Sequence, residues 1–273
     1  MSNKLLITLV QTHLVWENKA ANLKNLQEKI KTLEEKSNIV VLPEMFSTGF
    51  TMNAAAMAET MDGPTLAWMR QIAIEKRIIL TGSIIVKEKN NSGHETYFNR
   101  LIWMLPNGQY GQYDKRHLFS FANEDQYYTA GNKRLLASVN DWKINLQICY
   151  DLRFPVWARQ TPPTRKENPS GLYDVLIYVA NWPERRRLAW ITLLQARAIE
   201  NQCYVIGVNR IGKDGHQTSH CGDSMVIDPL GEILYHKKDA EEIFTIALDK
   251  KHLHGIREKF TFWQDADEFS LFE

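Results

Sequence analysis

Three segments of the chain place a side chain with catalytic potential directly after an apolar or hairpin-forming run. Glu44 follows the apolar run 40–43, Lys115 follows a predicted β-hairpin, and Cys149 follows the predicted strand 142–148. Rigid scaffolds commonly present functional side chains at such strand ends. A free thiol with a pKa near 8.5 is mostly protonated at neutral pH, and a neighbouring carboxylate can accept its proton. Because a fixed ammonium stabilises a developing oxyanion, the three side chains together predict nucleophilic attack on a carbonyl-type carbon.

Each of these residues, taken singly, also has a purely structural explanation. A lone cysteine at a strand end is commonly a small core residue. A lysine after a hairpin is commonly solvated, and a glutamate after a proline commonly begins a helix. His117, close to Lys115, also invites a competing Cys–His pairing. The hypothesis therefore rests on the occurrence of all three residues together.

The elements that must position these residues alternate between apolar strands and amphipathic helices. We predict helices at 23–33, with Asn18 as N-cap, at 66–75, and through 188–199 with Pro183 in the first turn. Strands are predicted at 5–10, 39–42, 78–86, 98–105, 109–114, 142–148, 175–180 and 204–208, with a further hairpin at 224–235. Alternation favours sheets covered by helices, whereas the hairpins argue against a purely parallel sheet. A two-sheet sandwich with outer helices satisfies both signals, and the proline-rich segment 161–171 is predicted to be an exposed excursion.

Composition restricts the class of protein. The 273 residues are 44% hydrophobic and 24% charged, as in an ordinary globular protein. A net charge of +1 provides no general field for nucleic acid or an anionic membrane, so neither is expected as a partner. No segment approaches the roughly 20 apolar residues of a membrane span. The apolar run within 1–11 is too short for a signal peptide and is interpreted as a first strand.

The cysteines and histidines outside the three segments indicate no disulfide framework and no metal site. The cysteines are Cys149, Cys203 and Cys221, an odd and widely spaced set that suits a reducing compartment, so the cytoplasm is expected. Cys203 and Cys221 are interpreted as core residues. His252 and His254 lie in a charged tail without a surrounding ligand set, and we expect them to be solvated.

The strings around the three residues resemble those of the nitrilase superfamily of carbon–nitrogen hydrolases. That family has an apolar-Pro-Glu string, an Asp-Lys-x-His-Leu-Phe string and a Cys-Tyr-Asp-x-Arg-Phe-Pro string, which stand here at Glu44, Lys115 and Cys149 in the same order. The resemblance extends over nearly the whole chain, including the segments 194–201 and 222–231. It implies one domain over 1–273, an α/β fold with four layers in an α-β-β-α sandwich, and no cofactor.

The resemblance also implies roles for individual residues. Cys149 would be the nucleophile, Glu44 the base, and Lys115 the oxyanion partner together with the backbone N–H of Tyr150, through a thioester intermediate. Glu124 corresponds to a second glutamate that binds the lysine, although a solvated loop carboxylate remains the alternative. A carboxylate near a buried lysine is also electrostatically sensible. His117 would be structural.

Within the superfamily the chain is most similar to the omega-amidases, which hydrolyse the terminal amide of 2-oxo dicarboxylic acid monoamides. The Cys149 string and the segment Asn181-Trp182-Pro183, which precedes basic residues, carry this similarity. The substrate's remote carboxylate needs a cationic partner. Arg153 is the first candidate because a guanidinium binds a carboxylate bidentately, with a structural ion pair as the alternative. Arg185 and Arg186, near a predicted helix N-terminus, are further candidates, and Trp182 is expected to line the same site.

Two other functions remain open at this point. The chain could be an amidase or carbamoylase acting on another small amide, or a non-catalytic binding protein with the same fold. Members of the family usually pair as dimers through helices, so a homodimer or higher homo-oligomer is expected. Trp157 and Trp190 could serve that contact or lie in the core.

Overall fold

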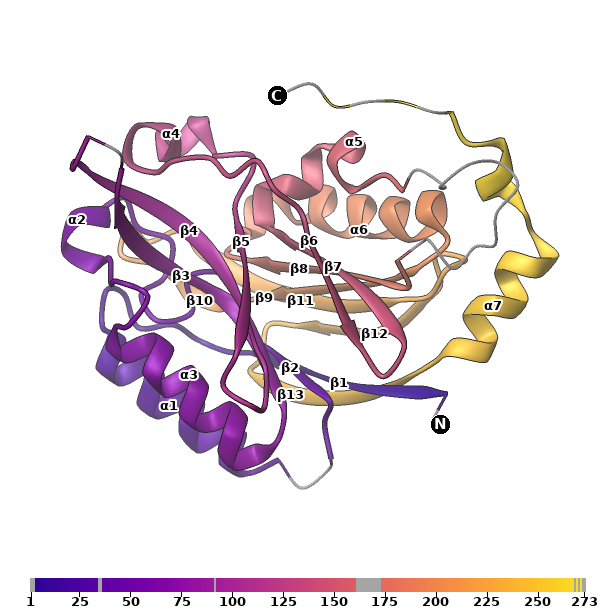
Figure 1. The fold of residues 1–273 in the computed structure, drawn as a ribbon, viewed down its shortest axis with the longest axis horizontal. Helices are drawn as coiled ribbons and strands as arrows, with labels where there is room; N and C mark the ends of the chain where they lie inside the picture. The colour runs from indigo at the N-terminus through magenta and orange to yellow at the C-terminus, as the bar shows by residue number, and fades with distance from the viewer. Residues whose placement is uncertain are drawn as a thin grey trace.

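The computed structural model of the chain describes residues 3–33, 36–90, 92–160 and 173–267, together with 269 and 271. The proline-rich segment 161–171, predicted as an excursion, lies outside the described residues. Two β-sheets and the helices on their outer sides make up the fold (Figure 1).

The first sheet has six strands and carries the N-terminal part of the site. Across the sheet these are β13 (Glu242–Asp249), β1 (Lys4–Gln11), β2 (Ile39–Val41), β3 (Ile79–Lys89), β4 (Glu95–Met104) and β5 (Tyr110–Asp114). Strands β1, β2 and β3 run parallel, and the other pairs are antiparallel. The sheet is therefore mixed, as the hairpin and buried-strand signals together predict.

The second sheet has seven strands and carries the nucleophile segment. Six of them run in the order β10 (Ile211–Lys213), β11 (Ser219–Ile227), β9 (Tyr204–Asn209), β8 (Val175–Ala180), β7 (Trp142–Ile148) and β6 (Leu135–Val139), and β12 (Ile233–Lys238) pairs with β11. Strands β7, β8 and β9 are parallel neighbours, so their carboxyl ends lie at the same edge. Cys149 and Asn181 follow two of these ends.

The helices cover the outer faces of the two sheets. The longer ones are α1 (Lys19–Lys31), α3 (Pro64–Lys76), α6 (Arg187–Asn201) and α7 (Lys250–Lys259), and single-turn helices are α2 (Ala54–Met57), α4 (Glu124–Tyr127) and α5 (Pro155–Ala158). Asn18 caps α1 as predicted, because its side chain accepts a hydrogen bond from the N–H of Ala21. Figure 1 shows α1 and α3 together on the outer side of the first sheet and α6 beside the second.

The alternation of side chains along β1 shows how the layers are joined. Leu5, Ile7 and Leu9 pack in the main core with residues of the second sheet, whereas Val10 packs in a second cluster with Leu26 of α1. Because successive strand residues point to opposite faces, one face of the first sheet packs on the other sheet and its opposite face on helices. The fold is an α-β-β-α sandwich, as predicted.

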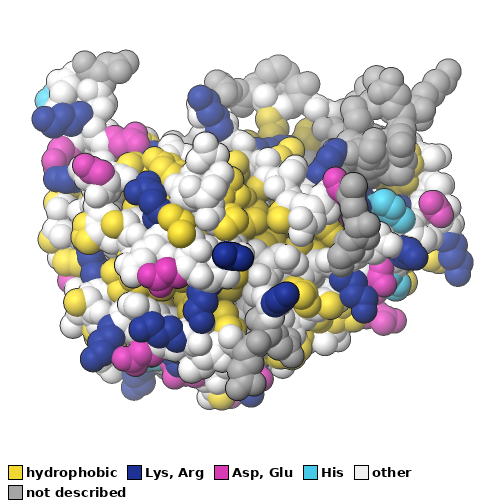
Figure 2. Space-filling model, turned by 60° about the horizontal axis from the view of Figure 1, so that its bottom comes forward, with side chains coloured by type: hydrophobic (Ala, Val, Ile, Leu, Met, Phe, Trp, Pro, Cys, Tyr) yellow, Lys and Arg dark blue, Asp and Glu magenta, His cyan; other side chains and the backbone are white. Residues whose placement is uncertain are grey.

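Several elements differ from the sequence-based prediction. Pro183 is the N-cap of a short 3₁₀ turn (Glu184–Arg186) and lies outside the first turn of α6, which begins at Arg187. The segment predicted to be a charged tail contains α7, and β13 and β6 were not predicted. Trp157 and Trp190 are both buried in the core, so the core interpretation holds for each. On the face shown in Figure 2, side chains of both charges are interspersed around apolar ones.

Candidate active site

Glu44 lies three residues beyond the end of β2 and is completely buried. Its Oε1 accepts hydrogen bonds from Asn99 Nδ2 at 2.8 Å and from Lys115 Nζ at 2.9 Å. Its Oε2 accepts a hydrogen bond from the backbone N–H of Asn181 at 2.8 Å. These donors come from β4, from the end of β5 and from the end of β8. The pairing of strands within the two sheets therefore brings these three donors together at the Glu44 carboxylate.

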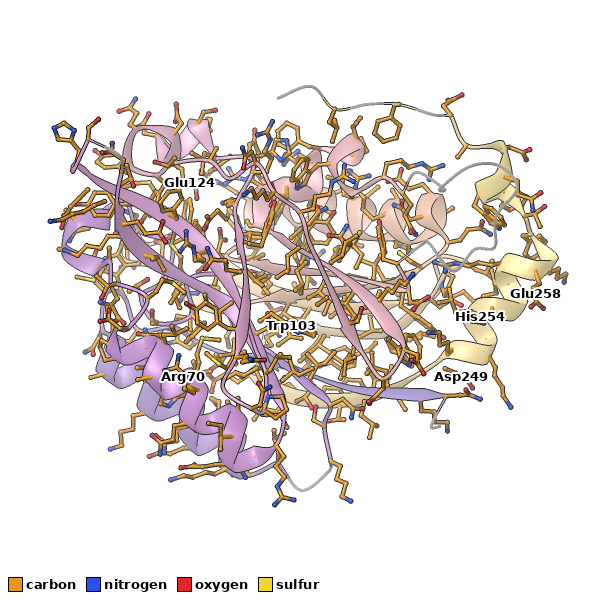
Figure 3. The ribbon with its side chains drawn as sticks, in the orientation of Figure 1. Arg70, Trp103, Glu124, Asp249, His254 and Glu258 are labelled. Carbon is orange, nitrogen blue, oxygen red and sulfur yellow. The ribbon has the colours of Figure 1, made fainter. Side chains whose placement is uncertain are left out.

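Lys115 follows β5 directly and is held between two carboxylates. Its Nζ lies 3.0 and 2.9 Å from the two oxygens of Glu124, on α4, in addition to its contact with Glu44. Burial lowers the pKa of Lys115, but the charges of Glu124 and Glu44 outweigh it, and the pKa stands above its ordinary value. Glu124 is fully buried, so its placement excludes the solvated-loop alternative. Figure 3 labels Glu124 beside the α4 turn.

Cys149 stands at the end of β7, where the chain turns into a 3₁₀ helix (Cys149–Arg153). Its φ of 43° lies in the left-handed region, which is uncommon for residues other than glycine. Residues with such strained backbone angles cluster at functional sites. Burial, followed by the charge of Glu44, raises the pKa of the thiol well above its ordinary value, and Lys115 opposes this shift. Cys149 and Glu44 line the same cavity. The neutral form of the thiol is thus favoured beside the Glu44 carboxylate.

Asp151, two residues after the cysteine, joins the nucleophile turn to the lysine segment. Its Oδ2 accepts hydrogen bonds from Tyr113 Oη at 2.7 Å and from the N–H of Ile148 at 3.0 Å. Its Oδ1 lies 2.9 Å from the N–H of His117 and 2.8 Å from His117 Nδ1. The imidazole of His117 is engaged by Asp151 and stacks on Phe154, with ring centroids 3.8 Å apart. His117 is not among the described residues that line the cavity containing Cys149 and Glu44.

A cavity of about 290 Å³ opens onto Glu44, Lys115 and Cys149. All the residues predicted to bind substrate line it, namely Tyr150, Arg153, Trp182, Arg185 and Arg186. Aromatic and apolar side chains complete much of the wall, among them Phe50, Phe119 and Phe121. The cavity therefore combines three ionisable groups of the site with three arginines.

The three arginines of the cavity have no carboxylate within 4.0 Å among the described residues. The structural ion pair considered for Arg153 is therefore not found in the described part of the chain. Its guanidinium instead lies 5.0 Å from the centroid of the Trp182 ring. Burial, followed by the neighbouring charge of Arg185, lowers the pKa of Arg186, and Arg153 adds to this shift. The three arginines of the cavity thus repel one another and would gain from an anion.

Two residues that sequence reasoning missed hold the catalytic cluster together. Asn99 donates to Glu44 and, at 3.3 Å, to Glu124 Oε1. Asn181 binds Glu44 through its backbone N–H, and its side-chain amide donates to the Glu44 carbonyl oxygen. Asn181 was noted only as part of a string. The one available signal for Asn99 was its place, with Arg100, directly before the apolar end of β4.

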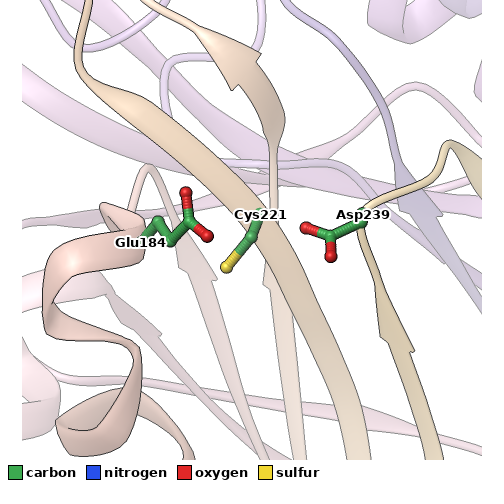
Figure 4. A group of neighbouring side chains, drawn as sticks. All are labelled: Glu184, Cys221 and Asp239. Atoms are coloured by element: carbon green, nitrogen blue, oxygen red, sulfur yellow. The ribbon is translucent and has the colours of Figure 1, made fainter.

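A second group of potential ligands lies on the outer side of the second sheet. The ligand atoms of Glu184, Cys221 and Asp239 fall within 4.8 Å of one another (Figure 4). Asp239 is already paired with Lys238 at 3.0 Å. The thiol of Cys221 donates to Asp223, and burial raises its pKa to about 12. Two of the three potential ligands are therefore already engaged by other side chains.

The fold and this cavity define a carbon–nitrogen hydrolase. The sequence model of the carbon-nitrogen hydrolase family matches residues 6–258, and the chain belongs to that family. It falls in the omega-amidase-like branch of the nitrilase superfamily and is a hydrolase acting on non-peptide carbon–nitrogen bonds.

Particular relatives show how far the similarity extends. The chain is 42% identical to omega-amidase YafV of Escherichia coli K12 over 269 residues, 98% of each chain. It is 29% identical to 2-oxoglutaramate amidase of Bacillus subtilis, over 96% of this chain and 97% of that one. The crystal structure of XC1258 from Xanthomonas campestris, a CN-hydrolase superfamily protein with an arsenic adduct in its active site, superposes with a TM-score of 0.92 at 42% identity. It covers 99% of this chain and 100% of that one. No helix among the described residues is both long and apolar enough to cross a bilayer.

Proposed function

We propose that the protein hydrolyses the terminal amide of small 2-oxo dicarboxylic acid monoamides, such as 2-oxoglutaramate and 2-oxosuccinamate, to the dicarboxylic acid and ammonia. The observation that carries this proposal is the presence of two kinds of group in one cavity. A thiol, a carboxylate and an ammonium line it together with three arginines that have no ion-pair partner among the described residues. Relatives named for omega-amidase and 2-oxoglutaramate amidase activity support the same substrate class.

In the first half-reaction Glu44 accepts the thiol proton, and the sulfur of Cys149 attacks the amide carbon. The resulting oxyanion is stabilised by the ammonium of Lys115 and by the backbone N–H of Tyr150. Glu44 then transfers its proton to the amide nitrogen, so that the C–N bond breaks and ammonia leaves. The acyl group remains on Cys149 as a thioester.

In the second half-reaction Glu44 removes a proton from water, and the hydroxide attacks the thioester carbon. The same two donors stabilise the second oxyanion. Collapse breaks the C–S bond, and the proton held by Glu44 returns to the sulfur. Lys115 keeps its charge throughout because Glu124 remains paired with it.

The substrate's remote carboxylate would bind Arg153, Arg185 or Arg186, which line the same cavity. A guanidinium presents its N–H groups in a fork that matches a carboxylate. The ring of Trp182 supports Arg153 from one side. This arrangement favours an amide with an anionic end over a neutral amide of the same length.

The proposal is tested by measuring ammonia release from 2-oxoglutaramate, 2-oxosuccinamate, glutamine and neutral aliphatic amides. We expect the highest kcat/KM for the 2-oxo acid monoamides and no turnover by Cys149→Ala. Mass spectrometry of enzyme trapped with substrate should show an acyl adduct on Cys149. Equal kcat/KM for neutral amides would refute the substrate class, and a Cys149 that never acylates would refute the mechanism.

A homodimer in the cytoplasm, implied by the family resemblance and by the cysteine content, is part of the same proposal. The outer side of α6 exposes Leu188 and Ile199, at 77% and 54% of their surface, which is unusual for such large apolar side chains on a helix. The mass in solution, measured by light scattering, should be twice that of one chain. A monomeric mass would contradict this expectation.

A further inference from the structure

A short loop at the mouth of the cavity is tied at its base to the carboxylate of Glu124. The N–H of Phe119 donates to Glu124 Oε2 at 2.6 Å, and the N–H of Glu124 donates to the carbonyl oxygen of Phe119 at 3.2 Å. Between these two bonds the chain forms one 3₁₀ turn (Ser120–Ala122), followed by Asn123 with a φ of 59°. The carboxylate that binds Lys115 therefore also anchors this loop, which gives the loop a defined position relative to the catalytic cluster.

The loop presents two phenyl rings to the cavity, and Arg186 lies against both. The guanidinium carbon of Arg186 is 4.9 Å from the ring centroid of Phe119 and 5.8 Å from that of Phe121. Phe121 is 75% exposed, so it contributes little to the core. Packing in the core therefore does not account for its position beside Arg186 at the cavity.

Contact with aromatic faces has a different consequence from contact with a carboxylate. A ring attracts a cation through its quadrupole but accepts none of the in-plane N–H groups, so the hydrogen-bonding edge of the guanidinium stays available. A carboxylate in the same place would neutralise Arg186 and occupy that edge. Arg153 shows the same arrangement over Trp182. Both arginines are thus held in place while their donors remain available.

We propose that Phe119 and Phe121 are positioning residues that set the preference for anionic amides by holding Arg186 toward the substrate's remote carboxylate. This inference rests on the proposed function and extends it to two residues outside the catalytic cluster. Neither ring needs to touch the scissile amide, and their effect reaches the substrate through Arg186. Their loss should therefore weaken binding of the anionic end and leave the chemical step largely unchanged.

Phe121→Leu is the first test, because leucine keeps apolar volume at an exposed position while removing the aromatic face. The quantity to measure is the ratio of kcat/KM for 2-oxoglutaramate to kcat/KM for a neutral amide of similar length. We expect the ratio to fall about 2- to 5-fold, the range for one exposed cation–π contact, and mainly through the KM of the anionic substrate. Phe121→Tyr, which retains the aromatic face, should keep the wild-type ratio.

Two further variants test whether Phe121 acts by positioning Arg186 or only by closing the mouth of the cavity. In an Arg186→Met background, Phe121→Leu should change the ratio no further, because the two side chains act through one contact. Phe262→Leu, the same substitution at a 63% exposed phenylalanine outside the cavity, should leave the ratio at the wild-type value. Equal losses for both substrates in Phe121→Leu, or an undiminished effect in the Arg186→Met background, would overturn the inference.

A separate readout distinguishes failure of this inference from failure of the proposed function. Glutarate, a dicarboxylate, can be tested as a competitive inhibitor of neutral amide hydrolysis, whichever amide is the natural substrate. Phe121→Leu should raise its inhibition constant about 2- to 5-fold. An unchanged inhibition constant would overturn the role of Phe121 even if 2-oxoglutaramate proves to be the best substrate.

Discussion

The Nζ of Lys115 lies 3.0 and 2.9 Å from the two carboxylate oxygens of Glu124, and both side chains are completely buried. A buried ammonium without a partner would tend to lose its proton, and a buried carboxylate without one would tend to gain it. Glu44 adds a second carboxylate 2.9 Å from the same Nζ. With both carboxylates ionised the group carries one excess negative charge. That charge favours a neutral thiol at Cys149.

Replacing Glu124 by glutamine tests whether this pairing serves the reaction. Glu124→Gln keeps the shape of the side chain and an acceptor for Phe119, but it removes the charge that holds Lys115. We expect kcat for 2-oxoglutaramate to fall about 100-fold, the usual loss when an oxyanion-stabilising group is impaired, with a smaller change in KM. The matched control is Asp125→Asn, the adjacent exposed carboxylate on α4. A kcat for Glu124→Gln close to that of the control would argue against the role.

Two arginines that both lie over tryptophan rings allow a matched test of the carboxylate subsite. The guanidinium of Arg153 lies 5.0 Å from the ring centroid of Trp182, and Arg153 lines the cavity. The guanidinium of Arg134 lies 4.8 Å from the ring centroid of Trp157, but Arg134 is not among the residues that line the cavity. Arg153→Met should raise the KM for 2-oxoglutaramate about 10-fold or more, as expected for a lost charged hydrogen bond, and affect neutral amides less. Arg134→Met should leave both KM values unchanged. A similar KM increase for both classes of amide in Arg153→Met would show that this arginine does not recognise the carboxylate.

Because two thiols are buried, we expect the free energy of unfolding to fall at alkaline pH. Burial raises the pKa of Cys149 and Cys203 above the value of about 8.5 that a thiol has in an unfolded chain. Above that pH the unfolded chain releases these protons while the native protein retains them, so the free energy of unfolding falls as pH rises. Each thiol contributes a slope of about 1.4 kcal/mol per pH unit.

The slope is measured by urea unfolding between pH 8 and 9.5, below the range in which tyrosines titrate. Cys203→Ala lowers stability at every pH because it leaves a cavity. The pH slope, however, should become shallower than in the wild type. An identical slope in Cys203→Ala would contradict the prediction.

The imidazole of His220, which lines the cavity, leads us to expect that the free energy of unfolding also falls at acid pH. Burial, followed by the positive charge of Arg210, lowers the pKa of His220 to about 4, although Asp214 opposes the shift. Below about pH 6.5 the unfolded chain binds a proton that the native protein does not, so stability is lost as pH falls toward 4. At pH 5 this loss is about 2 kcal/mol relative to neutral pH. His220→Gln should remove that part of the acid dependence in the same unfolding measurement, and an unchanged acid dependence would count against it.

Much of the local structure could be predicted from the sequence because strand and helix periodicities are local signals. The strand that ends before Glu44, the hairpin before Lys115 and the strand before Cys149 all stand where their patterns indicate. Strand β13 was missed although it pairs with β1 along its whole length. Its side chains are mostly half-buried, so the contrast between apolar and polar positions is weak. Pairing across more than 200 residues leaves no local trace.

By itself, the sequence determined the reactive residue types, the strand ends that carry them and the family to which the strings belong. The tertiary structure alone decided which side chains meet: Asn99 and Asn181 converge on Glu44 through strand pairing, and aromatic rings rather than carboxylates hold Arg153 and Arg186. The physical reason is that a side chain's partners depend on which strands become neighbours. That choice is made by burial of the whole core, and residues adjacent in the chain do not encode it.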